Sequence, residues 1–277
     1  MENMVEPTFT EARGDVCASI NYLKVMAQRP ARYLCTPPPG MPELNWELES
    51  HPVRVFNGRR RLSSFSIETQ GFTLRRAASA MTNFYDHEQV RHTYYPEVER
   101  LVREVTDAHH VLAFDDNVRN GSKAERQKTG AFPPARFVHG DYTPKSAPQR
   151  IRDLLPAQEA EHAITRRYAF VNVWRPISGP VQNEALALLD AQSIAPRDLV
   201  ATDLLYSDRT GEIYNVTFNP AHRWYYFRYM EAGEVMVFAN FDSRNNMSVP
   251  HSAFFDPTAA ADAPPRESIE VRTIAFF

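Results

Sequence analysis

Short runs of aromatic and β-branched residues alternate with polar or proline-containing turns through the second half of the chain. Such runs are typical of β-strands. The pattern predicts strands at 136–138, 168–176, 199–206, 213–218, 224–230, 235–241 and 268–277. Because loops rather than long helices join most of these runs, a double sheet is favoured over a βαβ fold. We therefore predict a mainly β fold with flanking helices, a double-stranded β-helix (jelly roll, cupin-like).

Helical patterns are fewer and lie mostly outside this β region. Apolar residues at helical spacing predict helices at 96–107, 156–164 and 184–192, and a short apolar run predicts a strand at 111–114. Residues 120–134 contain charged residues and glycine with almost no apolar side chains, so they predict a surface loop. The sequence leaves open whether this loop is a mobile lid or a tolerated insertion.

The length of 277 residues and the hydrophobic content of 43% allow one large core or two modest ones. We predict a single catalytic domain over 1–277. In this interpretation residues 1–135 form an N-terminal elaboration of helices and strands, and its helices pack outside the jelly roll. Residues 136–277 form the β-helix core.

Charge and cysteine content exclude several classes of protein. The 31 basic and 34 acidic side chains give a formal charge of −3 without a broad basic field, so we expect no nucleic-acid partner. Cys17 and Cys35 form no Cys-x-x-Cys pair, which fits a reducing cytoplasm. The N-terminus carries Glu2 and Glu6 rather than a basic targeting segment, and no apolar run approaches the ~18 residues of a membrane span.

A small-molecule substrate is the expected partner, and the oligomeric state stays open.

The most informative short motif is His139-Gly140-Asp141, which follows a predicted strand. Residues two apart on a strand point to the same side, so this spacing presents an imidazole and a carboxylate together. A third ligand would complete a set of two histidines and one carboxylate, which leaves positions free on iron(II) for a chelating cosubstrate and dioxygen. His251, after most of the predicted strands, is the strongest candidate.

Arg266 and Ser268 lie at the start of the last predicted strand. With the same two-residue spacing, the guanidinium of Arg266 can grip a carboxylate while Ser268 donates a hydrogen bond. This pair fits the far carboxylate of 2-oxoglutarate, and Arg272 on the same strand face is a weaker candidate. A surface ion pair with Glu267 or Asp262 is the alternative for Arg266.

The sequence resembles the fungal and bacterial CmcJ/AsaB/gibberellin desaturase-like family of non-haem iron, 2-oxoglutarate-dependent oxygenases. The similarity runs almost from end to end, and several blocks in the right order are more specific than any one. The blocks are Ile20-Asn-Tyr-Leu23, Asn83-Phe-Tyr-Asp86, Tyr94-Tyr-Pro-Glu97, His139-Gly-Asp-Tyr-Thr-Pro144, Asn172-Val-Trp-Arg-Pro176, Trp224-Tyr-Tyr-Phe227, Asp242-Ser243, Pro250-His251 and Arg266-Glu-Ser-Ile-Glu-Val-Arg272.

The resemblance implies an enzyme that binds Fe(II) and uses 2-oxoglutarate and O2 to oxidise an unactivated C–H bond of a secondary metabolite or amino-acid-derived compound. It implies His139, Asp141 and His251 as iron ligands, and Arg266 and Ser268 as the carboxylate clamp. Hydroxylation, desaturation and oxidative cyclisation all stay possible outcomes.

Further side chains in these blocks are candidates for the substrate pocket: Tyr142, Asn172, Trp174 and Tyr226. Strand alternation sends Asn172 and Trp174 to one face and Arg175 to the other. An equally supported interpretation puts Trp174 in the core and pairs Arg175 with a carboxylate. Tyrosines that simply fill a β core are the commoner outcome.

Two other functions use the same residues differently. A zinc-dependent hydrolase or lyase also keeps three protein ligands and an open position, but it has no use for Arg266 and Ser268. A metal-free binding protein on the same fold is the third alternative, and only metal analysis decides against it.

Overall fold

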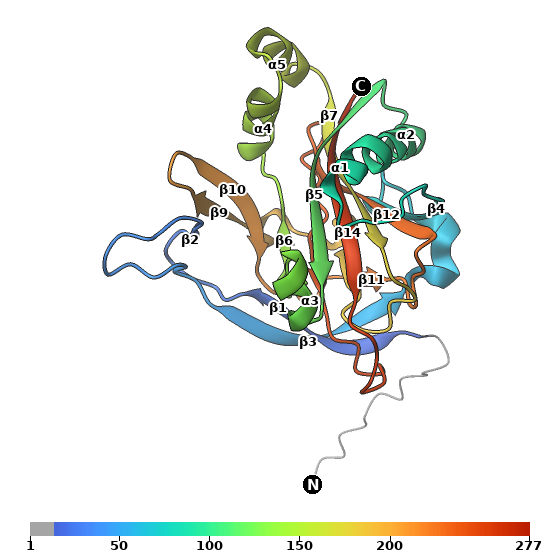
Figure 1. Cartoon of the computed structure of the whole chain (residues 1–277). Helices are drawn as coiled ribbons and strands as arrows, with labels where there is room; N and C mark the ends of the chain where they lie inside the picture. The colour runs from blue at the N-terminus through green and yellow to red at the C-terminus, as the bar shows by residue number, and fades with distance from the viewer. Residues whose placement is uncertain (1–13) are drawn as a thin grey trace.

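Two β-sheets face each other in the computed structural model, which describes residues 14–277. Their apolar inner faces meet in one large core, to which Trp174 and Phe238 contribute from one sheet and Leu188 and Trp224 from the other. This arrangement confirms the predicted mainly β architecture (Figure 1). Residues 1–13, which contain the N-terminus predicted to lack a targeting signal, lie outside the described residues.

The larger sheet has nine strands and is antiparallel except at two pairings. In spatial order its strands are β1 (Val16–Leu23), β3 (Leu48–Asn57), β11 (Trp224–Tyr226), β8 (Leu186–Leu189), β13 (His251–Ala253), β6 (His139–Gly140), β10 (Thr210–Val216), β9 (Leu199–Leu205) and β2 (Ala31–Tyr33). The middle of the sheet is made of very short strands, so the side chains there come from widely separated parts of the chain.

The smaller sheet has five strands in the order β4 (Phe72–Arg76), β12 (Glu234–Asp242), β7 (Tyr168–Pro176), β14 (Glu267–Phe276) and β5 (His110–Asn120). Every residue of β7 and β12 is buried, because both faces of this sheet are covered. The inner face packs on the larger sheet. Helix α2 (Tyr95–Thr106) covers the outer face, as the sequence predicted for an N-terminal helix (Figure 1).

Helix α2 docks through an apolar stripe with four-residue spacing. Tyr94, Val98 and Val102 are buried and pack in one cluster with outer-face valines such as Val171 and Val173. The stripe begins one turn earlier at Val90, in the π-helical turn (Val90–Tyr94) that links α1 (His87–Gln89) to α2. The predicted helix at 96–107 is therefore confirmed.

Two helices close one end of the sandwich, α4 (Ser146–Leu154) and α5 (Ala157–Ile164). They pack through Ala147, Ile151 and Ala160 against Phe170 and Ile274. Helix α5 confirms the prediction at 156–164. Helix α4 follows the His139 motif directly, and its position above the sheets matters for the site (Figure 1).

Some predicted elements are wrong. The helix expected at 184–192 is instead strand β8, because four consecutive buried apolar residues pair with β11 on one side and β13 on the other. The segment 120–134, expected to be a loop throughout, contains α3 (Lys123–Thr129), which the Ser122 side chain caps by accepting from the backbone of Glu125. The short strand at 111–114 is part of the longer β5.

Residues 14–135 contribute strands to both sheets as well as the outer helix α2. Strands β1 and β3 belong to the nine-stranded sheet, and β4 and β5 belong to the five-stranded sheet. The expected division at residue 135 therefore marks no boundary between sheets, while the single domain stays our prediction. Among residues 14–277, no helix is both long enough and apolar enough to span a bilayer.

Phe72 tests how far the two sheets depend on each other. Its ring is fully buried and contacts Tyr225 of the opposite sheet, at a centroid distance of 6.0 Å. We expect Phe72→Ala to lower the free energy of unfolding by about 3–5 kcal/mol, because it leaves a cavity between the sheets. Denaturant-induced unfolding measures this loss. The matched control is Leu62→Ala at an exposed position, and a similarly small effect for both variants would contradict the prediction.

Candidate metal centre

His139 and His251 lie opposite each other on neighbouring strands. Their Cα atoms are partners in the antiparallel pairing of β6 with β13, and their rings are 4.4 Å apart between centroids. Each Nδ1 lies near the carbonyl oxygen two residues earlier, at 3.0 Å from Phe137 and 3.3 Å from Val249. Because a carbonyl only accepts, each Nδ1 carries the hydrogen. Both Nε2 atoms therefore keep their lone pairs for a metal.

Asp141 follows β6 and completes the set. Its Oδ1 lies 3.8 Å from Nε2 of His139, and one ligand atom from each of the three residues lies within 4.8 Å of the others. The other oxygen, Oδ2, accepts hydrogen bonds from Asn172 at 2.9 Å, Asn240 at 2.8 Å and Arg272 at 3.0 Å. Three donors on one oxygen hold the carboxylate in place and leave the other oxygen to face the imidazoles.

Burial and nearby charge set the protonation states that a metal requires. Burial, together with the neighbouring His251, lowers the pKa of His139 to about 4, and burial also lowers the pKa of His251. Burial opposes ionisation of Asp141, but Arg272 and the two histidines outweigh it and hold its pKa well below the usual range. At neutral pH the site thus presents two neutral imidazoles and one carboxylate, which bind metal without first losing protons.

A narrow pocket beside the histidines contains buried polar atoms that have no partner among the described residues. His139, His251, Trp174 and Arg266 line it. The Nε of Arg266 and the Oγ of Ser268 are buried without a hydrogen-bond partner, while Nη1 of Arg266 donates to the carbonyl oxygen of Glu184 at 2.6 Å. Unsatisfied buried donors are costly, so this pair indicates a missing acceptor.

The acceptor that fits is a carboxylate. Burial and the nearby Arg119 lower the pKa of Arg266 to about 9, so its guanidinium stays cationic at neutral pH. The guanidinium also lies 5.4 Å from the centroid of the Trp174 ring, which limits its movement. A two-histidine, one-carboxylate site next to a buried cation with free donors fits iron(II) and a chelating dicarboxylate.

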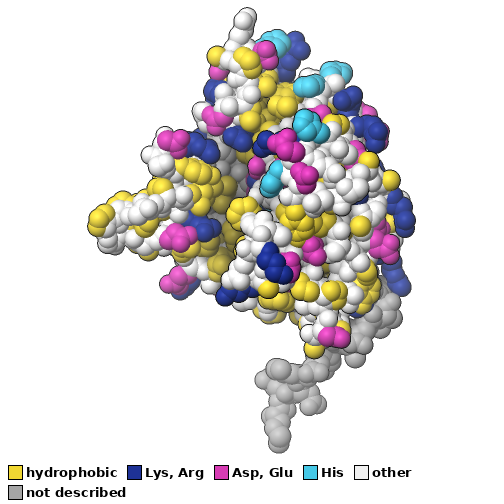
Figure 2. Space-filling view, viewed as in Figure 1, with side chains coloured by type: hydrophobic (Ala, Val, Ile, Leu, Met, Phe, Trp, Pro, Cys, Tyr) yellow, Lys and Arg dark blue, Asp and Glu magenta, His cyan; other side chains and the backbone are white. Residues whose placement is uncertain are grey.

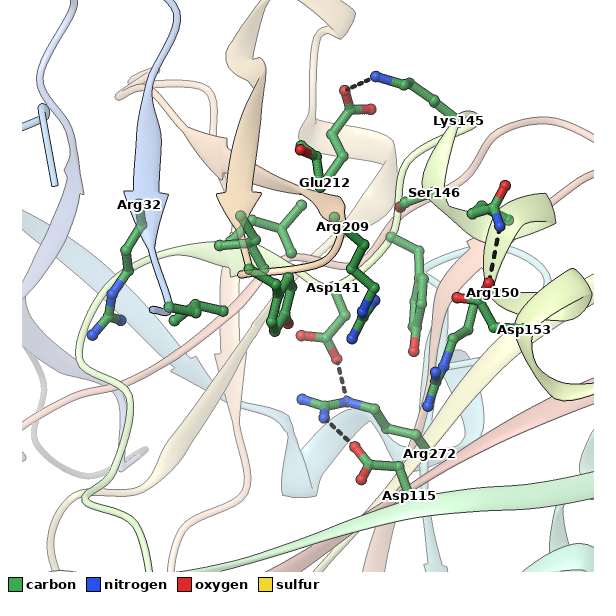
Figure 3. A pocket seen from close by; sticks show the side chains of 18 of the residues that line it. Arg32, Asp115, Asp141, Lys145, Ser146, Arg150, Asp153, Arg209, Glu212 and Arg272 are labelled. Carbon is green, nitrogen blue, oxygen red and sulfur yellow. Dashed lines mark hydrogen bonds and ion pairs between the residues drawn. The ribbon is translucent and has the colours of Figure 1, made fainter. Parts of the chain in front are cut away.

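His139 and Asp141 also line a second and much larger cavity, of about 720 Å³ (Figure 3). Its walls come from β5, α4, the turn between β9 and β10, and β14. A cavity of this size takes a drug-sized small molecule. Figure 2 shows hydrophobic side chains in the hollow beside the projecting β9 and β10 hairpin.

The residues predicted to line the substrate pocket lie in different parts of the structure. Tyr142 lies in the wall of the large cavity and stacks on Phe170 at 4.0 Å. Asn172 and Trp174 share a face, as alternation predicted, but Asn172 holds Asp141 and Trp174 lies beside Arg266. Whether Tyr142 touches a substrate stays a prediction.

Three sequence-based assignments need correction. Tyr226 is in the core, where it packs on Phe254 and donates to the carbonyl oxygen of Gly14, because β11 directs it away from the cavity. Arg272 does not join Arg266: it lies further along β14 and is committed to Asp141 and Asp115. Arg175 faces the opposite side as expected, but donates to Tyr94 and backbone carbonyls rather than pairing with a carboxylate.

Sequence reasoning missed Asn240, Glu270 and Arg119. Asn240 lies at a bulge in the pairing of β12 with β7, and its side chain both donates to Asp141 and accepts from the Asp141 backbone at 2.8 Å. Glu270 and Arg119 line the narrow pocket. The sequence could have indicated Glu270, because it lies two residues after Ser268 on the same strand face. It could not have indicated Asn240, because a bulge breaks the alternation there.

Comparison with known proteins agrees with this geometry. A family model described as "Oxidoreductase/YMDC permease-like domain" matches residues 20–276. A protein of Aspergillus novofumigatus, "Fe(II)/2-oxoglutarate-dependent dioxygenase nvfI", is 34% identical over 88% of this chain and 90% of its own length. The "Hydroxylase/desaturase efuI" of Hormonema carpetanum is 31% identical over 82% of this chain and 84% of its own length.

The chain belongs to this fungal family of iron(II)- and 2-oxoglutarate-dependent oxygenases. A solved structure of the "iron and alpha-ketoglutarate-dependent endoperoxidase NvfI" superposes on it with a TM-score of 0.85 and 30% identity, over 95% of this chain and 98% of that one. The double-stranded β-helix predicted for this oxygenase is thereby confirmed.

Asn240 gives a direct test of how this oxygenase holds its metal. We expect Asn240→Ala to weaken binding of iron(II) or cobalt(II) by about 10- to 100-fold, since Asp141 loses two of the contacts that orient it. Calorimetric titration of the metal-stripped protein measures the affinity. The exposed Asn245→Ala is the control. Unchanged affinity in a folded Asn240→Ala variant would show that the asparagine does not orient the ligand.

Proposed function

We propose that this oxygenase binds Fe(II) through His139, Asp141 and His251 and oxidises an unactivated C–H bond of a small secondary metabolite. One observation carries the proposal: the converging triad lies next to the buried, unpaired donors of Arg266 and Ser268. The family membership supports it. The pairing of a metal site with a carboxylate clamp is what a chelating 2-oxo acid requires.

Arg266 and Ser268 would bind the far carboxylate of 2-oxoglutarate, with Nη1 of Arg266 already held by Glu184. The acid's other end would then reach the metal between His139 and His251, which line the same pocket. When bound, iron with 2-oxoglutarate and O2 supplies the oxidant, as the 2-oxo acid is converted to succinate and carbon dioxide.

The chain's own contribution is to hold ligands and position the substrate. Asn172, Asn240 and Arg272 orient the carboxylate of Asp141, and their donors leave only one of its oxygens for the metal. Tyr142, buried beside His139, limits access of water to that side. Hydroxylation, desaturation and ring closure differ only in how the reacting carbon is placed afterwards, so the shape of the large cavity decides the outcome.

The two alternatives account for less of the structure. A zinc hydrolase or lyase would use the triad but leave Arg266 and Ser268 without a role, and a metal-free binding protein would leave the triad unexplained. The proposal includes a cytoplasmic site of action and no nucleic-acid partner. Near-balanced charge and the absence of any Cys-x-x-Cys pair support both.

Anaerobic spectroscopy tests the metal and the cosubstrate together. Addition of iron(II) and then 2-oxoglutarate to the metal-stripped protein should produce a saturable visible absorption band of chelated 2-oxoglutarate. His139→Ala should remove the band, because one of three ligands is lost. Folded protein that shows no band and retains zinc through purification would support the hydrolase instead.

Arg266→Gln tests the clamp separately from the metal. We expect the concentration of 2-oxoglutarate that half-saturates the band to rise by at least about tenfold, since a charge-assisted, bidentate contact is lost. Iron affinity should not change. Arg244→Gln, which removes a half-exposed arginine paired with Glu68, is the control. A normal half-saturation point in Arg266→Gln would exclude Arg266 as the cosubstrate clamp.

A further inference from the structure

Some of the cationic side chains that line the large cavity are paired with carboxylates of the described residues, and others are not. Arg32 is bound to Glu43 at 2.8 Å and Lys145 lies 3.7 Å from Glu212. Arg272 is committed to Asp141 and Asp115. Two further arginines, Arg150 and Arg209, line the same cavity.

Neither Arg150 nor Arg209 forms an ion pair with any carboxylate of residues 14–277. The one acid of α4 that lines the cavity, Asp153, accepts a hydrogen bond from Gln149 at 2.9 Å instead. The contacts that the two arginines make are to aromatic rings. The Arg150 guanidinium lies 5.1 Å from the centroid of Phe114, and that of Arg209 lies 4.1 Å from the centroid of Tyr206.

Ring contacts suit a guanidinium that binds an anion. A face resting on an aromatic ring limits the positions of the group while its N–H donors stay at the edge, available in the plane. The two arginines come from separate walls, Arg150 from α4 and Arg209 from the turn between β9 and β10, and Figure 3 shows both directed into the cavity.

Part of the remaining lining is apolar, between polar residues such as Asp153 and Glu212. The apolar part is formed by the side chains of Leu34, Phe114, Tyr142, Leu204 and Ile213. A ligand that matches both the two arginines and the apolar side chains has an apolar body and an anionic group. A carboxylate fits the guanidinium fork, which can bind it through two parallel N–H···O bonds.

We propose that the substrate of this oxygenase is an apolar small molecule carrying a carboxylate, which Arg150 and Arg209 bind from opposite walls of the cavity. This inference rests on the proposed function, because it names the substrate class of the same site. The arginines act on specificity: they anchor one end of the molecule, so that its apolar body extends toward His139 and Asp141.

Matched acid and amide probes test the charge requirement. Protein saturated with iron(II) and 2-oxoglutarate is titrated anaerobically, by calorimetry, with 1-naphthylacetate and with its neutral amide, 1-naphthylacetamide. Saturating 2-oxoglutarate occupies Arg266, so binding of the acid reports the large cavity. We expect the acid to bind at least about tenfold more tightly than the amide.

Variants assign that preference to the two arginines. Arg150→Gln and Arg209→Gln should each weaken binding of the acid several-fold and leave the amide unchanged, and the double variant should bind the two probes equally. Arg32→Gln, in the same cavity but removing an arginine already bound to Glu43, should keep the full preference. Thermal unfolding confirms that each variant is folded.

The results separate this inference from the proposed function. Equal binding of acid and amide, no binding of either, or a preference that survives in the double variant would overturn the carboxylate site. The visible band, recorded on the same sample, reports iron and 2-oxoglutarate independently. If the band fails, the titrations are repeated in the Arg266→Gln background without metal, where an acid preference that depends on Arg150 and Arg209 would still support the anion site.

Discussion

The pairing of β6 with β13 is the constraint on which the candidate metal centre depends. These strands have two and three residues, yet their register brings His139 opposite His251 in the middle of the nine-stranded sheet. A slip of one residue would turn one imidazole to the opposite face and separate the two nitrogen ligands. The backbone two residues before each histidine supplies the carbonyl that sets its tautomer, so register also determines which nitrogen faces the metal.

The inner face of β14 extends this arrangement in a line. The side chains of Ser268, Glu270 and Arg272 point inward from β14. Arg272 lies opposite Asn172 of the neighbouring strand β7. Glu270 lines the narrow pocket, and Arg272 donates a hydrogen bond to the carboxylate of Asp141. Burial raises the pKa of Glu270, whose Oε1 accepts from Asn172 at 3.2 Å. Such a network is stable only when complete, because removal of one member leaves a buried charge without its partner.

The candidate metal ligands line two cavities of different character, and His139 lines both. The narrow one contains the buried cation of Arg266, and the wide one combines apolar side chains with several charged ones, including Arg150 and Arg209. The proposed cosubstrate and substrate would therefore occupy separate cavities beside the same histidine. Helix α4, which forms part of the wall of the wide cavity, lies outside the two sheets, so it can vary without moving the strands that carry the histidines (Figure 1).

The sequence by itself determined those features that depend on local spacing. The His139 motif and the pair of Arg266 with Ser268 each follow from the two-residue repeat of a strand, and the amphipathic stripe of α2 follows from helical periodicity. Only the tertiary structure decided that Asn240 orients Asp141, that Tyr226 belongs to the core and that 184–192 is a strand rather than a helix. Those outcomes depend on pairing between segments far apart in the chain and on a bulge that breaks alternation, and neither leaves a pattern in the local order of residues.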